Sequence, residues 1–136
     1  MTQKDKQKIQ ISIDHANTDD QLWFPNDTDA ELLLDVFQDD NNIYVKSTIA
    51  GADADKLDIS INNDMLTIRG RREDDEEINF DDYFYKECYW GSFSRSIILP
   101  VEVKTDEIKA EMHRGVLKIT LPKVKRTRNI PINIKD

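Results

Sequence analysis

The chain has 136 residues, of which 38% are hydrophobic and 34% are charged, and its formal net charge is -8. This length suffices for one domain with a single core and no metal or disulfide staple, and the acidic balance argues against nucleic acid as a general partner, because phosphate contacts need a basic face. The one cysteine, Cys88, rules out an intrachain disulfide, and no stretch is apolar for long enough to be a signal peptide or a membrane span, so we expect a cytoplasmic protein without a membrane segment.

Residues 1–30 are mostly polar and contain several turn-forming residues, and they predict a flexible N-terminal arm rather than part of the core. Two apolar spots interrupt this arm. The first is an alternating triplet whose side chains share one face if the segment is extended, namely Ile9, Ile11 and Ile13. The second is a compact cluster of Leu22, Trp23 and Phe24. Both spots either pack on the domain or contact other protein molecules, and the sequence leaves these two alternatives open.

Residues 31–122 predict one domain built from short strands. Residues 32–37 form a nearly continuous apolar run, and apolar residues then alternate with polar ones over residues 43–49 and 57–61. Turn-forming residues separate these segments at 39–42, 50–51 and 62–64. Several short alternating strands between turns favour an all-β fold, an immunoglobulin-like β-sandwich, over a helical or α/β fold.

The middle of the chain departs from this pattern. Residues 73–82 are rich in carboxylates, but they lack the Asp-x-Asp-x-Asp-Gly order that wraps Ca²⁺, so a solvated acidic loop is favoured. The next segment, residues 83–90, carries aromatic residues on both faces, which is unusual for a strand that is solvated on one side. We therefore expect this segment to be buried against a second molecule.

The last part of the domain predicts a β-hairpin. Apolar residues alternate over 108–112 and again over 117–121, and Gly115 between them supplies the positive φ that a tight reversal needs. Pro122 is expected to end the final strand. Residues 123–136 then form a charged C-terminal tail that ends in alternating isoleucines.

Three motifs in this order resemble those of the small heat-shock protein (α-crystallin) family. Residues 110–117, Ala-Glu-Met-His-Arg-Gly-Val-Leu, resemble the Ala-x-x-x-Asn-Gly-Val-Leu signature, with Arg114 where the family usually has Asn. Residues 91–100 resemble the block that precedes it, and Ile130-Pro131-Ile132 resembles the Ile-x-Ile tail. If the backbone of Arg114 adopts the left-handed conformation, its Cβ strains the turn by about 1 kcal/mol.

The resemblance implies a dimer formed by strand exchange, in which a loop segment of one subunit pairs with the first core strand of its partner. The residues expected in this loop contact are Tyr83, Phe84 and Tyr85, together with Arg95. The family often has Glu-Arg shortly before the glycine that opens the block resembled by residues 91–100, whereas this chain has Glu87-Cys88. The ion pair made by that arginine is therefore missing here, and we expect Arg95 to pair with Glu87 or with the acidic loop instead.

The resemblance also implies that the tail docks in a groove of a neighbouring subunit. The docking motif consists of Ile130, Pro131, Ile132 and Ile134, and it leaves open which isoleucine pair sets the register. The accepting groove is implied between two strands, with Leu57, Ile59 and Ile61 on one and Ile108, Ala110 and Met112 on the other. The isoleucine triplet of the arm is a candidate competitor for the same groove.

The sequence offers little for other chemistry. His15 and His113 are isolated and Cys88 has no Cys-x-x-Cys partner, so we expect no metal site. There is no nucleotide-binding glycine loop and no nucleophile elbow, so we expect no cofactor, no catalytic residue and no enzyme activity.

The resemblance implies an ATP-independent holdase chaperone that forms homodimers and higher homo-oligomers and binds unfolding client proteins. The arm, through its two apolar spots, is then a contact for clients or subunits. The alternative is a monomeric CS-domain-like co-chaperone or adaptor, against which the isoleucine-rich tail and the aromatic loop argue. An enzyme or carbohydrate-binding sandwich has only generic aspartate and aromatic residues behind it.

Overall fold

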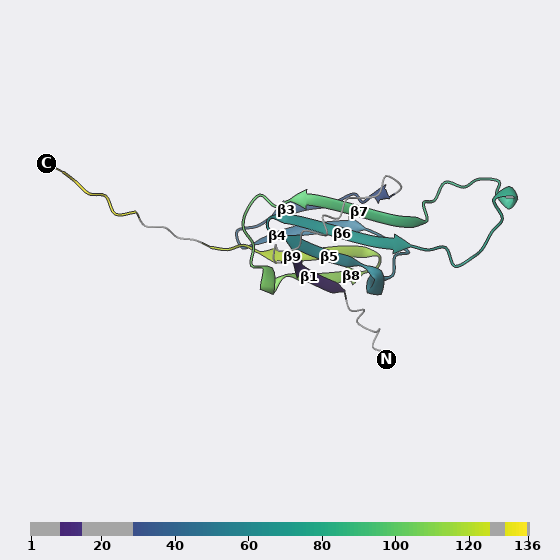
Figure 1. Ribbon diagram of the computed structural model, residues 1–136, viewed down its shortest axis with the longest axis horizontal. Helices are drawn as coiled ribbons and strands as arrows, with labels where there is room; N and C mark the ends of the chain where they lie inside the picture. Colours follow the sequence, from purple (N-terminus) through teal and green to yellow (C-terminus); the bar gives the residue numbers. More distant parts are fainter. Residues whose placement is uncertain (1–8, 15–28, 126–129, 136) are drawn as a thin grey trace, which may run out of the picture.

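The computed structural model describes residues 9–14, 29–125 and 130–135, and these form two β-sheets packed into a sandwich (Figure 1). The strand order is β1-β5-β6-β7-β2 in the first sheet and β3-β4-β9-β8 in the second. The predicted all-β sandwich is therefore confirmed. Its described strands are β1 (Gln10–Asp14), β2 (Ala30–Glu31), β3 (Asp35–Gln38), β4 (Asn42–Thr48), β5 (Asp58–Asn62), β6 (Met65–Arg72), β7 (Gly91–Ile98), β8 (Lys109–His113) and β9 (Val116–Pro122).

In the described part of the chain, three short 3-10 helices accompany the strands: η1 (Ala54–Lys56), η2 (Phe80–Asp82) and η3 (Thr105–Glu107). Asp53 caps η1, because its side chain accepts a hydrogen bond from the Asp55 N–H at 3.0 Å. Within the described residues, no helix combines the length and the hydropathy that crossing a membrane requires.

The core lies between the two sheets and consists of the apolar residues of the alternating segments. Every second residue of β4, β5 and β9 is buried, and the intervening residues are exposed or half-buried. Fully buried side chains include Ile59, Leu66 and Ile119. Burying each such side chain is worth about 1.5 to 3 kcal/mol relative to leaving it exposed, so the alternation dictates which face of each strand turns inward.

The β8–β9 hairpin has the predicted reversal. Arg114 and Gly115 have φ values of 51° and 76°, and two successive positive φ values are those of a type I′ turn. The Ile49 N–H donates a hydrogen bond of 2.7 Å to the Gly115 carbonyl oxygen, which ties the turn to the end of β4. β9 ends at Pro122, as expected.

The apolar run of residues 32–37 is not one strand. β2 pairs with β7 in the first sheet, whereas β3 pairs with β4 in the second, so the chain changes sheets between them. Leu32 enters the core at the crossing, and Leu33 is 77% exposed while its carbonyl oxygen accepts a hydrogen bond from the Ser47 hydroxyl at 2.8 Å. The need to bury Leu32 between the sheets breaks the strand in two.

β1 was expected to belong to an arm outside the core, but it is an outer strand of the first sheet. It runs parallel to β5, with Ile11 opposite Ile59 and Ile13 opposite Ile61. Ile9 and Ile11 are half-buried and pack against the core, which agrees with the first of the two alternatives for this spot. Leu22, Trp23 and Phe24 lie outside the described residues.

Candidate functional site

One margin of the sandwich carries the residues predicted to accept a tail. β5 is bordered by β6 on one side and by β1 on the other, and β8 is the outermost strand of the second sheet. In Figure 1, β1 and β8 both lie along the lower margin of the sandwich. We call this margin, formed by β1, β5 and β8, the acceptor edge.

The side chains of β5 and β8 differ at this edge. On and beside β5, Leu57, Ile59 and Ile61 are at most 2% exposed and belong to the core. The β8 side is less covered, because Ile108, Ala110 and Met112 are half-buried and pack on the core from its rim. The structure thus brings all six predicted residues to the same core, and it places β1, not the tail, along β5.

The tail itself extends away from the sandwich (Figure 1). Its isoleucines are almost fully solvated, with exposed fractions of 78% for Ile130, 87% for Ile132 and 86% for Ile134. Three alternating isoleucines that stay this exposed form an apolar strip open to another molecule. Docking of this strip in a second subunit stays a prediction.

The segment between β6 and β7 projects from the opposite side of the picture as a long loop (Figure 1). Residues 73–90 form no strand in this chain, and η2 is their one regular element. Phe84 is 98% exposed and Tyr85 is 85% exposed, whereas Tyr83 is half-buried. Phe84 and Tyr85, two of the three aromatic residues expected at a dimer contact, are therefore open to solvent in this chain.

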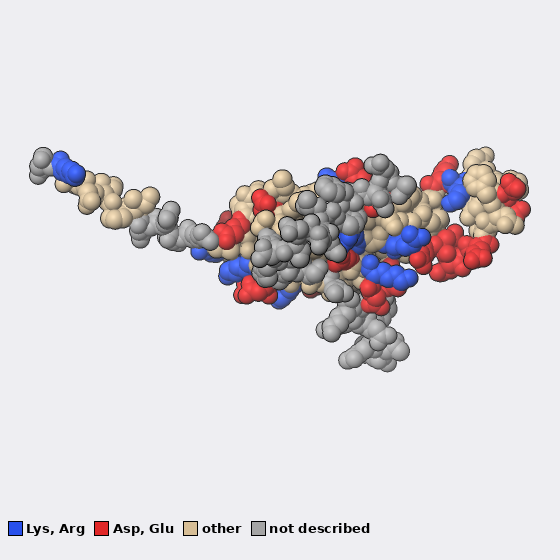
Figure 2. All heavy atoms as spheres, in the orientation of Figure 1, with Lys and Arg blue, Asp and Glu red and all other residues tan. Residues whose placement is uncertain are grey.

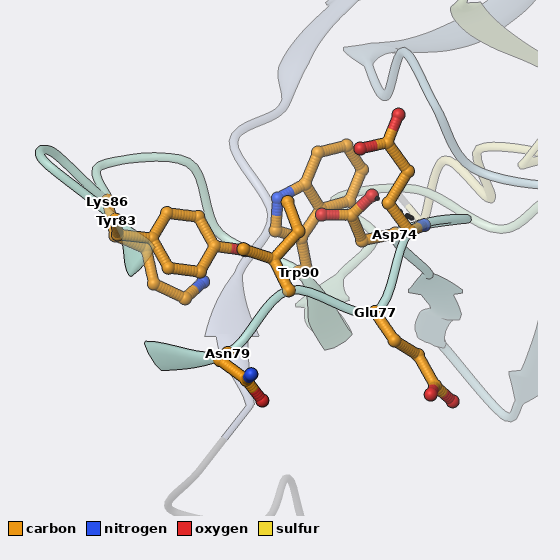
Figure 3. A pocket seen from close by; sticks show the side chains of 8 residues that line it. Asp74, Glu77, Asn79, Tyr83, Lys86 and Trp90 are labelled. Carbon is orange, nitrogen blue, oxygen red and sulfur yellow. Dashed lines mark hydrogen bonds between the residues drawn. The ribbon is translucent and has the colours of Figure 1, made fainter. Parts of the chain in front are cut away.

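Within the loop, an open hollow of about 380 Å³ lies between the acidic and the aromatic segments (Figure 3). Tyr83 and Lys86 lie together at one end, where the Lys86 ammonium is 5.2 Å from the centre of the Tyr83 ring. Asp74 lies beside Trp90 at the other end, and Glu77 points away from both. Because the lining is mostly charged or polar and open to solvent, this hollow lacks the apolar enclosure of a small-molecule pocket.

Acidic and basic side chains form two neighbouring groups where the loop leaves the sandwich. Figure 2 shows acidic side chains gathered along the loop and basic side chains beside them on the sandwich. Glu73 at the loop base pairs with Lys56 at 3.5 Å and with Arg71 at 3.0 Å. These pairs are half exposed, so each contributes little stability, but they hold the first residue of the loop against β6.

The expected partner of Arg95 was wrong. Arg95 lies on β7 and pairs with Glu31 of β2 at 3.1 Å, and its guanidinium also donates a hydrogen bond of 3.2 Å to the Leu32 carbonyl oxygen. It therefore contacts neither Glu87 nor the acidic loop in this chain. The reason is the parallel pairing of β2 with β7, which brings residues 31 and 32 beside the Arg95 side chain.

A polar cluster that the sequence analysis missed fixes the turn between β3 and β4. The Asp39 carboxylate accepts hydrogen bonds from the Tyr44 hydroxyl at 2.7 Å and from the N–H groups of Asn41 and Asn42 at 2.8 and 2.7 Å. The Tyr44 bond, followed by the two backbone bonds, lowers the pKa of Asp39, and the same Tyr44–Asp39 bond raises the pKa of Tyr44. The sequence Asp-Asp-Asn-Asn at residues 39–42 could have indicated this cluster, because Asp and Asn side chains often hydrogen-bond to nearby backbone N–H groups in turns.

This cluster holds an aromatic pair on the outer face of the second sheet. The Tyr44 ring stacks on Phe37 with ring centres 5.2 Å apart, and the Lys118 ammonium lies 5.1 Å from the Tyr44 ring centre. The arrangement stabilises the β3–β4–β9 face and has no catalytic geometry. Among the described residues, no group of three or more His, Cys, Asp or Glu side chains is placed to hold a metal ion.

Comparison with known proteins gives consistent matches. The model of the Hsp20/alpha crystallin family matches residues 35–135. Small heat shock protein C2 of Rickettsia felis is 34% identical over 116 residues, which cover 82% of this chain and 75% of that protein. Small heat shock protein C4 of the same organism is 33% identical over 100 residues, which cover 74% of this chain and 61% of that protein.

Two solved structures illustrate the match in fold. Heat shock protein 16.0 from Schizosaccharomyces pombe superposes with a TM-score of 0.64 at 26% identity, over 80% of this chain and 78% of that one. A small heat-shock protein from Xylella fastidiosa superposes with a TM-score of 0.65 at 25% identity, over 77% and 96% of the two chains. The sandwich fold is thus shared with solved small heat-shock proteins.

Proposed function

Because the chain belongs to the Hsp20/alpha crystallin family, we propose that it is an ATP-independent holdase chaperone that binds unfolding proteins and prevents their aggregation. The relatives named small heat shock proteins support a chaperone role. The observation that carries the proposal is the placement of exposed apolar side chains on two projecting segments. Phe84 and Tyr85 lie on the loop and the three isoleucines lie on the tail, while the sandwich has its own closed core.

Exposed apolar side chains on projecting segments, together with a closed core, suit a protein that binds other proteins on its surface and encloses no ligand. Contiguous exposed apolar surface marks protein interaction sites. The carboxylates of the loop and the lysines near the tail keep that surface solvated, so the chain can present apolar residues and remain dispersed.

Assembly would begin with strand exchange between two copies. Residues 83–85 of one copy would pair with the outer side of β2 in the other, where no strand of the described chain pairs. Arg95 supports this contact indirectly, because its bonds to Glu31 and the Leu32 carbonyl hold β2 on β7. Edge-to-edge addition would satisfy backbone groups that are otherwise left to solvent.

Tails would then join the dimers. Burying two isoleucine side chains is worth roughly 3 to 6 kcal/mol gross, and association and ordering consume much of this. One tail should therefore bind in a range nearer millimolar than nanomolar, and several tails would act together through effective concentration. The Xylella fastidiosa relative is described as having a distinct high order structure, which agrees with higher assembly in the family.

The test is to heat an aggregation-prone enzyme with and without the protein, in the absence of ATP, and to follow light scattering. We expect scattering to fall in proportion to the chaperone added. A variant with Phe84→Ser and Tyr85→Ser, whose parent side chains are 98% and 85% exposed, measures how much of the suppression depends on the loop. Equal scattering with and without the wild-type protein would refute the holdase function.

A further inference from the structure

We propose that β1 is the resting occupant of the acceptor edge, so that the two ends of the chain compete for one side of β5 and a tail docks only where β1 has been released. This inference rests on the tail docking proposed above and adds its regulation. The competing segments are β1 with the preceding Ile9, and the tail isoleucines of a second copy.

The two segments carry the same pattern. Three isoleucines at alternating positions occur in residues 9–13, Ile-Gln-Ile-Ser-Ile, and again in residues 130–134, Ile-Pro-Ile-Asn-Ile, and nowhere else in the 136-residue sequence. In an extended chain both place three identical side chains on one face at the same spacing. A surface that accommodates one segment therefore fits the other.

The structure shows which surface accommodates the first. β1 pairs in parallel with β5 over its five residues, from Gln10 opposite Asp58 to Asp14 opposite Asn62. Ile9 and Ile11 pack against the same core as Ile108, Ala110 and Met112 of the β8 side. The acceptor edge is thus covered by an Ile-x-Ile-x-Ile segment of the chain itself.

Exclusion between the two occupants follows from strand geometry. A strand has two hydrogen-bonding sides, and β6 occupies one side of β5 along its whole length. β1 occupies the other side, so a tail strand cannot pair there at the same time. A tail would have to replace β1 and not add to it.

Two factors decide whether β1 or a tail occupies the acceptor edge: the covalent connection of β1 to β5, and the entropy that each segment loses when it becomes ordered there. β1 belongs to the same chain as β5, which gives it a high effective concentration and favours it in a lone subunit. The tail has Pro131 where β1 has Gln10, and the fixed φ of proline lowers the ordering cost of the tail, although it removes one backbone donor. Assembly supplies many tails at once and shifts the balance towards them.

The first experiment measures competition directly with a labelled peptide of residues 128–135. The full-length protein carries Ile130→Ser, Ile132→Ser and Ile134→Ser, so that its own tail does not interfere. Adding Ile9→Ser and Ile11→Ser should tighten peptide binding roughly tenfold or more, which is the change expected if β1 covers at least about nine-tenths of the acceptor edges at equilibrium. As a matched control, Ile98→Ser changes an isoleucine that is 73% exposed on β7 and should leave the affinity unchanged.

The outcomes separate this inference from the function on which it rests. Equal or weaker peptide binding after the β1 substitutions would overturn the competition and leave tail docking intact. Absence of peptide binding to every variant would overturn tail docking and this inference with it, whereas suppression of aggregation could still be measured independently.

A second measurement locks β1 in place. Ser12 lies opposite Ser60 in the parallel register, and neighbouring strands about 4.8 Å apart meet the Cα spacing of a disulfide. In a Cys88→Ser background, the Ser12→Cys and Ser60→Cys pair should lower peptide affinity at least tenfold when oxidised, and a reductant should restore it. Unchanged peptide binding by the oxidised, cross-linked protein would refute the proposal.

Discussion

Ile132 is the residue of the tail on which both docking registers depend, because it belongs to the pair with Ile130 and to the pair with Ile134. We predict that Ile132→Ser alone shifts the protein from higher oligomers towards dimers. Ile132 is 87% exposed in its own chain, so the substitution removes nothing from the core. It removes about 1.5 to 3 kcal/mol of burial at the docked site, which lowers the affinity of each tail by roughly 10 to 150-fold.

The assay is native mass spectrometry together with sizing at several protein concentrations. The single variants Ile130→Ser and Ile134→Ser define the register, since the one outside the docked pair should leave the assembly unchanged. Ile98→Ser is the matched control, because Ile98 is 73% exposed on the sandwich and lies outside the tail. An assembly of Ile132→Ser that elutes and dilutes like the wild type would refute docking of the tail through either pair.

Three further predictions concern the turns and the loop. Arg114→Asn should raise the free energy of unfolding by up to about 1 kcal/mol in urea titrations, since asparagine tolerates φ of 51° better than arginine; a loss of stability would contradict the strain. Replacing Phe84 and Tyr85 by Ser should convert dimers to monomers on sizing without lowering the melting temperature of the sandwich, and persistent dimers would exclude the loop contact. Hydrogen bonds lower the pKa of Asp39, so the carboxylate's contribution to stability is complete above its ordinary pKa of 3.8 and is lost as the pH falls through the lowered pKa of the folded state. The difference in unfolding free energy between the wild type and Asp39→Asn should therefore narrow in acid, and a difference that stays constant with pH would disprove the linkage.

The sequence predicts those parts of the fold that local pattern controls. The alternation of apolar residues places β4, β5 and β9 and decides which of their side chains are buried, because a one-residue slip would expose the whole set. Gly115 indicates the hairpin reversal for a similarly local reason, since a positive φ favours glycine.

Long-range pairing is what the sequence leaves undetermined. The isoleucine alternation of residues 9–13 predicts an extended amphipathic segment, but nothing local indicates that it lies parallel to β5, about fifty positions later. Likewise, the partner of Arg95 is Glu31, which the parallel pairing of β2 with β7 brings close. The tail sites remain predictions for the same reason, because a second copy must supply the contact.

β1 connects the stability of the domain with the strength of the assembly. The tail isoleucines are solvated in their own chain, so changes there alter association without unfolding the sandwich. β1 is different, because it is a sheet strand and also covers the acceptor edge. It has five residues and, within the described part of the chain, one partner strand, whereas β6 is paired on both sides. We therefore expect β1 to open at a lower free energy than the core.

Hydrogen exchange of the full-length protein tests this difference. The backbone amides of β1 should exchange faster than those of β6, and the difference in rate should grow on mild heating. Equal protection of the two strands would mean that release of β1 requires global unfolding, and competition at the edge could not then regulate the folded protein.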